Sequence, residues 1–123
     1  MFNWYKKVVF ENFSNFNGRA RRLEYWSFVL FNIIFVVFGI FLEIVIEIIF
    51  ELPLDGLSLL YLFAVLLPGL AVGVRRLHDI NKSGWYILLP LIPLIGSIWL
   101  LVLFSIEGTP GVNSYGENPK QNI

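Results

Sequence analysis

The side chains of this sequence that could do chemistry gather in two short charged segments. Residues 19–24 read RARRLE, and residues 74–83 read VRRLHDINKS, which includes the only histidine of the chain. Arginine can hold a phosphate or a carboxylate through two parallel hydrogen bonds, so both segments are suited to binding an anionic group. The candidate site comprises the ionisable residues of the two segments and the tryptophan that follows them: Arg19, Arg21, Arg22, Glu24, Arg75, Arg76, His78, Asp79, Lys82 and Trp85.

These charged residues are open to two interpretations. In the first, the cluster binds anionic lipid headgroups or a partner protein, because each basic residue near an anionic membrane contributes about 1 kcal/mol. In the second, it fixes the orientation of the protein and ties its helices together, with Arg75 or Arg76 paired to Glu24 or Asp79. His78 is either a pH-sensitive group beside Asp79 or a hydrogen-bonding residue of the turn.

The sequence contains no pattern typical of an enzyme. His78 and Asp79 are adjacent, so on a helix their side chains point about 100° apart and do not form a base with its orienting carboxylate. No nucleophile elbow, phosphate-binding glycine loop or His-Glu-x-x-His zinc motif is present. A single histidine without any cysteine makes a poor transition-metal site. We therefore expect no catalytic activity, no bound metal and no cofactor.

The composition is typical of a membrane protein. Hydrophobic residues make up 57% of the 123 residues and charged residues 15%, and the mean hydropathy is +0.72. These values lie outside the averages of soluble domains. Nine basic and nine acidic side chains cancel, so the net charge indicates no nucleic-acid partner, and the absence of cysteine excludes disulfides. We expect an all-α protein with a single membrane domain over residues 1–123.

Three uncharged apolar segments are predicted to span the membrane. They cover residues 25–42, 57–74 and 84–104. A helix of 18 residues is about 27 Å long, which suffices for a hydrocarbon core of about 30 Å. Pro68 lies in the second segment and Pro90 and Pro93 in the third, where they leave helical carbonyls without their usual donors. Gly69 and Gly73 would admit a close neighbour, and we expect that neighbour to belong to the same chain.

Amphipathic or polar segments flank the predicted spans. Residues 1–17 carry aromatic and apolar residues at helical spacing, which indicates either a helix in the membrane interface or one packed against the spans. Glu43, Glu47 and Glu51 recur at every fourth position after the first span. A solvated helix face explains this stripe, with cation binding or self-association as the alternative. Residues 105–123 are rich in Gly, Pro and Asn and are predicted to form a polar tail.

The distribution of Lys and Arg predicts the orientation of the chain. Five precede the first span, none lies between the first and second, three lie between the second and third, and one lies in the tail. Basic residues are enriched on the cytoplasmic side of membrane proteins. Three spans would therefore put the N-terminus in the cytoplasm, and the acidic stripe and the C-terminus outside.

Four blocks of residues resemble one known family in the same order. They are Trp4-Tyr5; Gly18-Arg19-Ala20-Arg21-Arg22 with Glu24-Tyr25-Trp26; Arg75-Arg76-Leu77-His78-Asp79 with Ser83-Gly84-Trp85; and Gly108-Thr109-Pro110-Gly111 with Asn113, Tyr115, Gly116 and Pro119. The chain resembles the bacterial inner-membrane family known as domain of unknown function 805 over nearly its whole length. It departs from the family at Tyr86, Val112 and Ser114, where Trp, Pro and a basic residue are usual. The resemblance implies a multi-span membrane protein without an established activity.

Two kinds of function follow from these observations. The first is a structural or regulatory protein of the bacterial inner membrane, whose cytoplasmic cluster binds anionic phospholipid or a partner protein, with a homo-oligomer or a membrane-protein partner also compatible. The alternative is a small oligomeric transporter or channel. A transporter needs a polar route between its spans, and the three predicted spans contain no charged residue.

Overall fold

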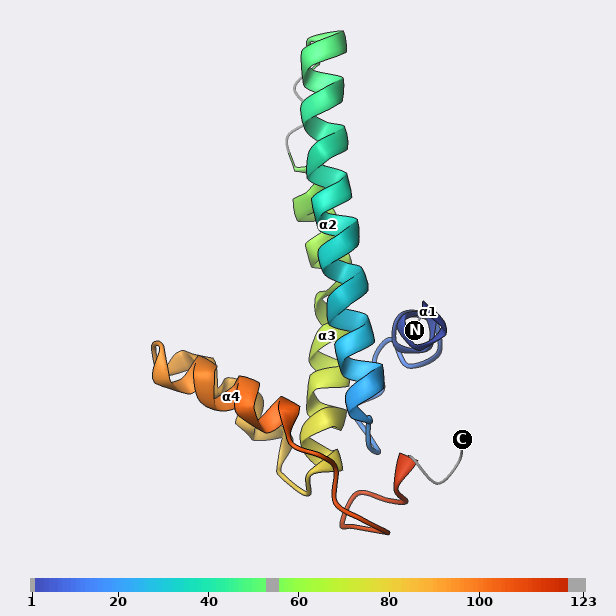
Figure 1. The fold of residues 1–123 in the computed structure, drawn as a ribbon, viewed down its shortest axis with the longest axis vertical. Helices are drawn as coiled ribbons and strands as arrows, with labels where there is room; N and C mark the ends of the chain where they lie inside the picture. Colours follow the sequence, from blue (N-terminus) through green and yellow to red (C-terminus); the bar gives the residue numbers. More distant parts are fainter. Residues whose placement is uncertain (1, 53–55, 120–123) are drawn as a thin grey trace.

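Two long apolar helices lie side by side and form the axis of the molecule. The computed structural model describes residues 2–52 and 56–119. Its elements are α1 (Phe2–Lys6), the π-helical turn η1 (Lys7–Glu11), α2 (Arg22–Phe50), α3 (Leu57–Asp79), the 3-10 helix η2 (Gly84–Leu91) and α4 (Ile95–Ser105). Figure 1 shows α2 and α3 as a rod, with α1 beside it and the hairpin of η2 and α4 projecting from the end where α3 finishes.

The helices of the axis, α2 and α3, are long and apolar enough to cross a membrane. The share of the apolar window that is buried within the protein is 0% for α2 and 28% for α3. A core helix of a soluble protein would bury its apolar face, so these side chains are suited to lipid. The first two predicted spans are thus confirmed as helices, and α2 continues past residue 42 to Phe50.

The third predicted span, residues 84–104, is not one helix. It consists of η2 and α4, which pack against each other and are joined by a turn in which Leu94 has a φ of 63°. Pro90 and Pro93 lack the amide donors that a continuous helix would need. Gly96 allows the close return, because a β-carbon there would overlap the Leu89 carbonyl. The 11 residues of α4 reach only about 16 Å, too short for a core of about 30 Å.

The C-terminal tail returns to the end of the rod where α2 begins and α3 finishes (Figure 1). The amide of Thr109 donates to the Asp79 carbonyl at 2.8 Å, and Asn113 and Gly116 form a short antiparallel bridge. The tail therefore lies at the same end of the rod as the basic segments, whereas three spans were predicted to separate the two. That prediction counted residues 84–104 as a third crossing, whereas these residues form the hairpin of η2 and α4.

The N-terminal helix packs against the axis through part of its surface. Tyr5 and Val8 are buried, and the Tyr5 ring stacks on Phe28 of α2 with the ring centroids 5.9 Å apart. The Tyr5 hydroxyl lies 2.6 Å from that of Tyr61, which in turn donates to Asn32 at 2.7 Å. Packing against the spans is thus confirmed for this face, whereas the predicted helix over residues 1–17 is too long, because helical structure ends at Glu11.

At the end of the rod away from the basic segments, α2 and α3 are joined by a hydrogen bond. The Glu43 carboxylate accepts a hydrogen bond of 2.6 Å from the amide of Ser58, in the first turn of α3. An anionic group is favourable there because the amides of a helix N-terminus lack partners within the helix. Glu43 of the predicted acidic stripe therefore caps a helix, whereas Glu47 and Glu51 are exposed.

The two glycines of α3 serve packing within the chain, as predicted. Gly69 faces the ring of Phe28, 3.5 Å from where its β-carbon would stand, and Gly73 faces Ile87 of η2. Small residues at these two positions let α2 and the hairpin approach the backbone of α3.

Candidate functional site

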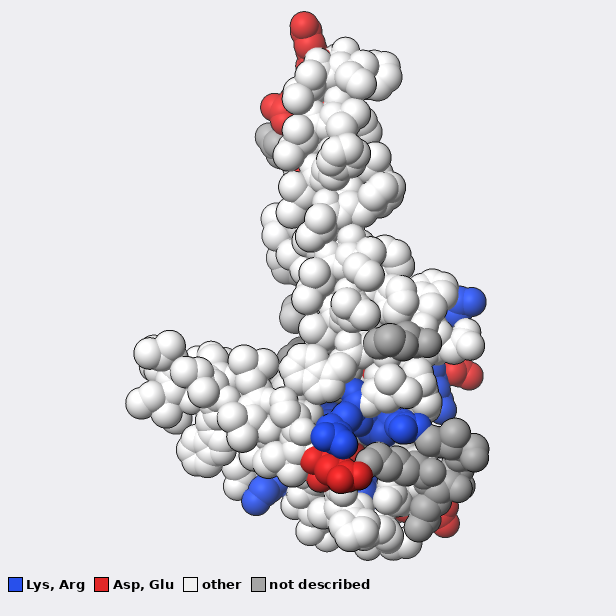
Figure 2. Space-filling view, viewed as in Figure 1, with Lys and Arg blue, Asp and Glu red and all other residues white. Residues whose placement is uncertain are grey.

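The last two turns of α3 and the start of α2 bring most of the candidate residues to one end of the rod. Arg75, Arg76, His78 and Asp79 belong to α3 and are all buried. Figure 2 shows the Lys and Arg side chains gathered at this end, and only acidic charges at the opposite end. Charged side chains are seldom buried unless they are paired, so their partners define what this cluster does.

Asp79 joins two buried arginines. Its Oδ1 accepts from Nε of Arg19 at 2.9 Å, and its Oδ2 accepts from Nη1 of Arg76 at 2.8 Å. The side chains of Arg19, Asp79 and Arg76 are 1%, 2% and 0% exposed. One carboxylate thus holds the loop before α2 against the end of α3.

The remaining donors of the same arginines bind the returning tail. Arg19 donates to the carbonyls of Thr109 at 2.6 Å and Gly111 at 2.7 Å, and Arg76 donates to those of Phe104 at 3.0 Å and Ile106. These carbonyls belong to the last turn of α4 and to the tail after it, where helical partners are lacking, so the guanidinium groups satisfy acceptors that would otherwise lack donors. Both arginines are therefore engaged within the protein.

The tail can approach Asp79 only because position 108 is glycine. A β-carbon at Gly108 would overlap the carboxylate of Asp79. The Thr109 amide and hydroxyl also donate to the Asp79 carbonyl, at 2.8 Å and 3.2 Å. The family block that begins with Gly108-Thr109 is thus the part of the tail that seals the buried charges.

A second ion pair links α3 to α2. Arg75 donates from Nη1 to Oε2 of Glu24 at 2.8 Å, and both side chains are 4% exposed. Arg75 also donates from Nε to the Asn15 carbonyl at 3.0 Å, and its own carbonyl accepts from the amide of Ala20 at 2.9 Å. Together, Arg19, Glu24, Arg75, Arg76 and Asp79 form what we call the buried ion-pair cluster.

His78 holds the loop before α2 and the tail. Its Nδ1 lies 2.9 Å from the carbonyl of Gly18, and its ring is stacked on Tyr115 with the centroids 3.9 Å apart and the planes 2° apart. A carbonyl oxygen only accepts, so this contact requires the proton on Nδ1. The geometry matches the prediction of a hydrogen-bonding histidine, and the pH-sensitive role stays a hypothesis.

Besides His78, four candidate residues lie outside the buried ion-pair cluster. Lys82 and Trp85 are exposed, with the Lys82 ammonium 5.9 Å from the centre of the Tyr86 ring. Arg22 is also exposed and donates to the Ser105 carbonyl at 3.3 Å. Arg21 lies over the Trp4 ring, 5.5 Å from its centre. The sequence grouped these residues with the others because it could not show which basic side chains point inward.

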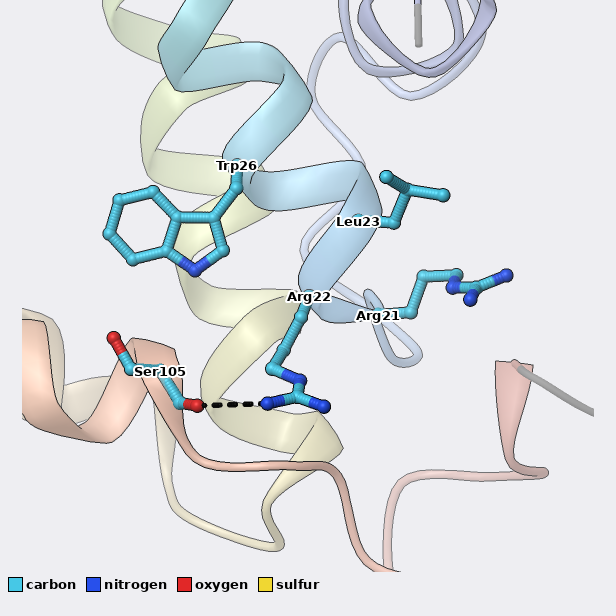
Figure 3. A pocket seen from close by; sticks show the side chains of 5 residues that line it. All are labelled: Arg21, Arg22, Leu23, Trp26 and Ser105. Carbon is cyan, nitrogen blue, oxygen red and sulfur yellow. Dashed lines mark hydrogen bonds between the residues drawn. The ribbon is translucent and has the colours of Figure 1, made fainter.

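A cavity of about 460 Å³ separates the start of α2 from the end of α4. Figure 3 shows its lining, with Arg22 and Trp26 of α2 facing Ser105 of α4, and with Leu23 and Arg21 at its edge. The hydrogen bond from Arg22 to the Ser105 carbonyl crosses this cavity. The hairpin is thus fixed to the basic end by its last residue.

Sequence reasoning missed the acceptors that complete the site. The backbone of Asn15, Gly18, Phe104 and Ile106 binds Arg75, His78 and Arg76, and backbone acceptors leave no trace in residue type. The tail residues Thr109, Asn113 and Tyr115 did carry a signal, since they stand in the fourth block of the resemblance. Among the residues that the structure describes, no group of three or more His, Cys, Asp or Glu side chains is placed to hold a metal ion.

The fold and the site define a helical membrane protein whose two long apolar helices are joined at one end by buried ion pairs. The chain belongs to the family described as "Protein of unknown function (DUF805)", whose model matches residues 13–117. It is 50% identical over 117 residues to "Inner membrane protein YhaI" of Escherichia coli K12, covering 95% of each chain. It is 43% identical over 121 residues to "Inner membrane protein YhaH" of the same strain, covering 96% of this chain and 97% of that one. No solved structure matches it significantly.

Proposed function

We propose that this protein is a structural or regulatory protein of the bacterial inner membrane, whose basic end lies at the cytoplasmic surface and binds anionic lipid headgroups. The relatives that it resembles are named as inner membrane proteins, which supports the location. In this proposal the buried ion-pair cluster is structural and does not bind lipid itself. It fixes the shape of the basic end, and other basic side chains meet the lipid.

The observation that carries the proposal is a set of basic side chains around the buried ion-pair cluster. The ion pairs of the described residues involve only Arg19, Arg75 and Arg76 among the basic side chains. Within that part of the chain, Lys6, Lys7, Arg21 and Lys82 form no ion pair. Each such charge near an anionic surface contributes about 1 kcal/mol of attraction.

The return of the tail supports an orientation with both ends in the cytoplasm. Two crossings, by α2 and α3, bring the chain back to the side where it began. The nearby basic residues favour the cytoplasmic side for that end, and the acidic residues Glu43, Glu47 and Glu51 lie at the other. The hairpin of η2 and α4 then lies within the cytoplasmic leaflet, where its exposed apolar side chains meet lipid.

The test is native mass spectrometry of the protein released from membranes that contain phosphatidylglycerol and phosphatidylethanolamine. We expect wild type to retain phosphatidylglycerol in excess of its share of the membrane. A variant with Lys6, Lys7, Arg21 and Lys82 all replaced by Gln should lose that excess while remaining folded. Wild type that retains the two lipids in the proportion of the membrane would contradict the proposal.

A further inference from the structure

A cavity between the N-terminal helix and the start of α2 has the lining of an anion site. Its volume is about 310 Å³, at the lower end of the range for small-molecule sites of about 300–1,000 Å³. Its lining includes Trp4 and Lys7 from the N-terminal helical segment, Arg21 and Glu24 from the start of α2, and Arg75 from α3. We propose that this cavity binds a phosphate group, either on a lipid headgroup or as a free anion; this rests on, and makes specific, the headgroup binding proposed above.

A buried cation of this cavity has an unused donor. The side chain of Arg75 is 4% exposed, and two of its three guanidinium nitrogens donate to Glu24 and Asn15. Its Nη2 has no hydrogen-bond partner among the described residues, and neither does Nε of Arg21, which is also buried. Buried donors of charged groups are costly to leave unpaired, and both donors belong to arginines that line this cavity, so an anion bound here would lie beside them.

The charge around the cavity is positive on balance. Glu24 is neutralised by Arg75, and Arg19, which also contributes to the lining, is neutralised by Asp79. Lys7 and Arg21 are the cations of the lining that form no ion pair with another described residue. Two uncompensated positive charges match a phosphate monoester, which carries about −1.5 to −2 at pH 7.

One aromatic ring contacts both of these cations. The Lys7 ammonium lies 5.2 Å from the centre of the Trp4 ring, and the Arg21 guanidinium lies 5.5 Å from it. The same aromatic ring thus positions both charges through cation–π contacts. Side chains that are already ordered lose less entropy when an anion binds.

The experiment compares two double variants that remove the same charge. Lys7→Gln/Arg21→Gln neutralises the two unpaired cations of the cavity. Lys6→Gln/Lys82→Gln neutralises two exposed basic residues that do not line it. Arg75 itself is left intact, because removing a buried ion-pair partner would unfold this end. Circular dichroism and gel filtration of the full chain in mild detergent check that both variants are folded.

Binding is measured by isothermal titration calorimetry at constant ionic strength, with inorganic phosphate in one arm and dioctanoyl phosphatidic acid in the other. We expect saturable binding to wild type, a Kd raised at least about tenfold in Lys7→Gln/Arg21→Gln, and a rise several times smaller in Lys6→Gln/Lys82→Gln, whose side chains attract anionic lipid at the surface but do not line the cavity. Binding of the lipid alone identifies a headgroup site, and comparable binding of inorganic phosphate identifies a site for the free anion.

Two outcomes overturn the inference. Either wild type binds neither probe saturably, or the two double variants weaken binding equally, which is the result expected of diffuse surface charge. If phosphatidylglycerol is nonetheless retained preferentially in the mass-spectrometry test, the proposed function stands and only the cavity site fails. If that preference is also absent, both fail.

Discussion

Replacing Asp79 by Asn tests how much the buried ion pairs stabilise the basic end. The Asp79 carboxylate is shared by Arg19 at 2.9 Å and Arg76 at 2.8 Å, and all three side chains are at most 2% exposed. Removing one partner of a buried pair costs about 3–5 kcal/mol, because the remaining charge stays buried without compensation. Asparagine keeps one carbonyl acceptor, so we expect the lower part of that range, about 3 kcal/mol.

The assay is reversible unfolding in mixed micelles, with sodium dodecyl sulfate titrated into a non-ionic detergent and helicity followed by circular dichroism. Glu47→Gln is the matched control, since it makes the same chemical change at an exposed position of α2. We expect it to alter the free energy of unfolding by less than about 0.5 kcal/mol. Equal effects of Asp79→Asn and Glu47→Gln would refute the reasoning, because they would show that the Asp79 charge carries no net stabilisation.

Three further predictions concern other contacts of the structure. Gly108→Ala should displace the tail from Asp79, and faster proteolysis within residues 109–119 would show this; unchanged cleavage would mean that the close approach is unimportant. Glu43→Gln should lower the free energy of unfolding by about 1 kcal/mol by weakening the cap of α3, whereas Glu47→Gln should not, and equal effects of the two would exclude the cap. Tyr61→Phe should lower the free energy of unfolding by about 1–2 kcal/mol in the same assay, since the Tyr61 hydroxyl bridges α1 and α2. An unchanged free energy of unfolding would show that this bridge does not stabilise the protein.

The sequence predicted α2 and α3 well, because an uncharged apolar run of membrane length has few alternatives to a spanning helix. It failed at residues 84–104, whose composition is equally apolar. There the two prolines and the turn at Leu94 divide the segment, and periodicity does not show whether a proline kinks a helix or reverses the chain. The prediction that the tail lies away from the basic segments followed directly from counting this segment as a crossing.

The charged residues were found from the sequence, but their partners were found only in part. Arg75 with Glu24 and Arg76 with Asp79 were among the pairs expected of a structural cluster, and both form. Arg19 with Asp79 was not expected, since 60 positions separate them and a loop without regular structure carries Arg19. Whether these side chains pair with each other or bind a ligand depends on their burial. Residue type alone does not determine that burial.

The most direct test of the central claim, that the tail is held at the basic end by the buried ion-pair cluster, is the topology of the C-terminus in living cells. A reporter enzyme that is active only outside the cytoplasm is fused after Ile123, and a second copy is inserted between α2 and α3 in a separate strain. If the tail is held at the basic end, the fusion at Ile123 is silent and the insertion is active. An active fusion at Ile123 would place the tail across the membrane from Arg19 and Asp79 and would contradict the account.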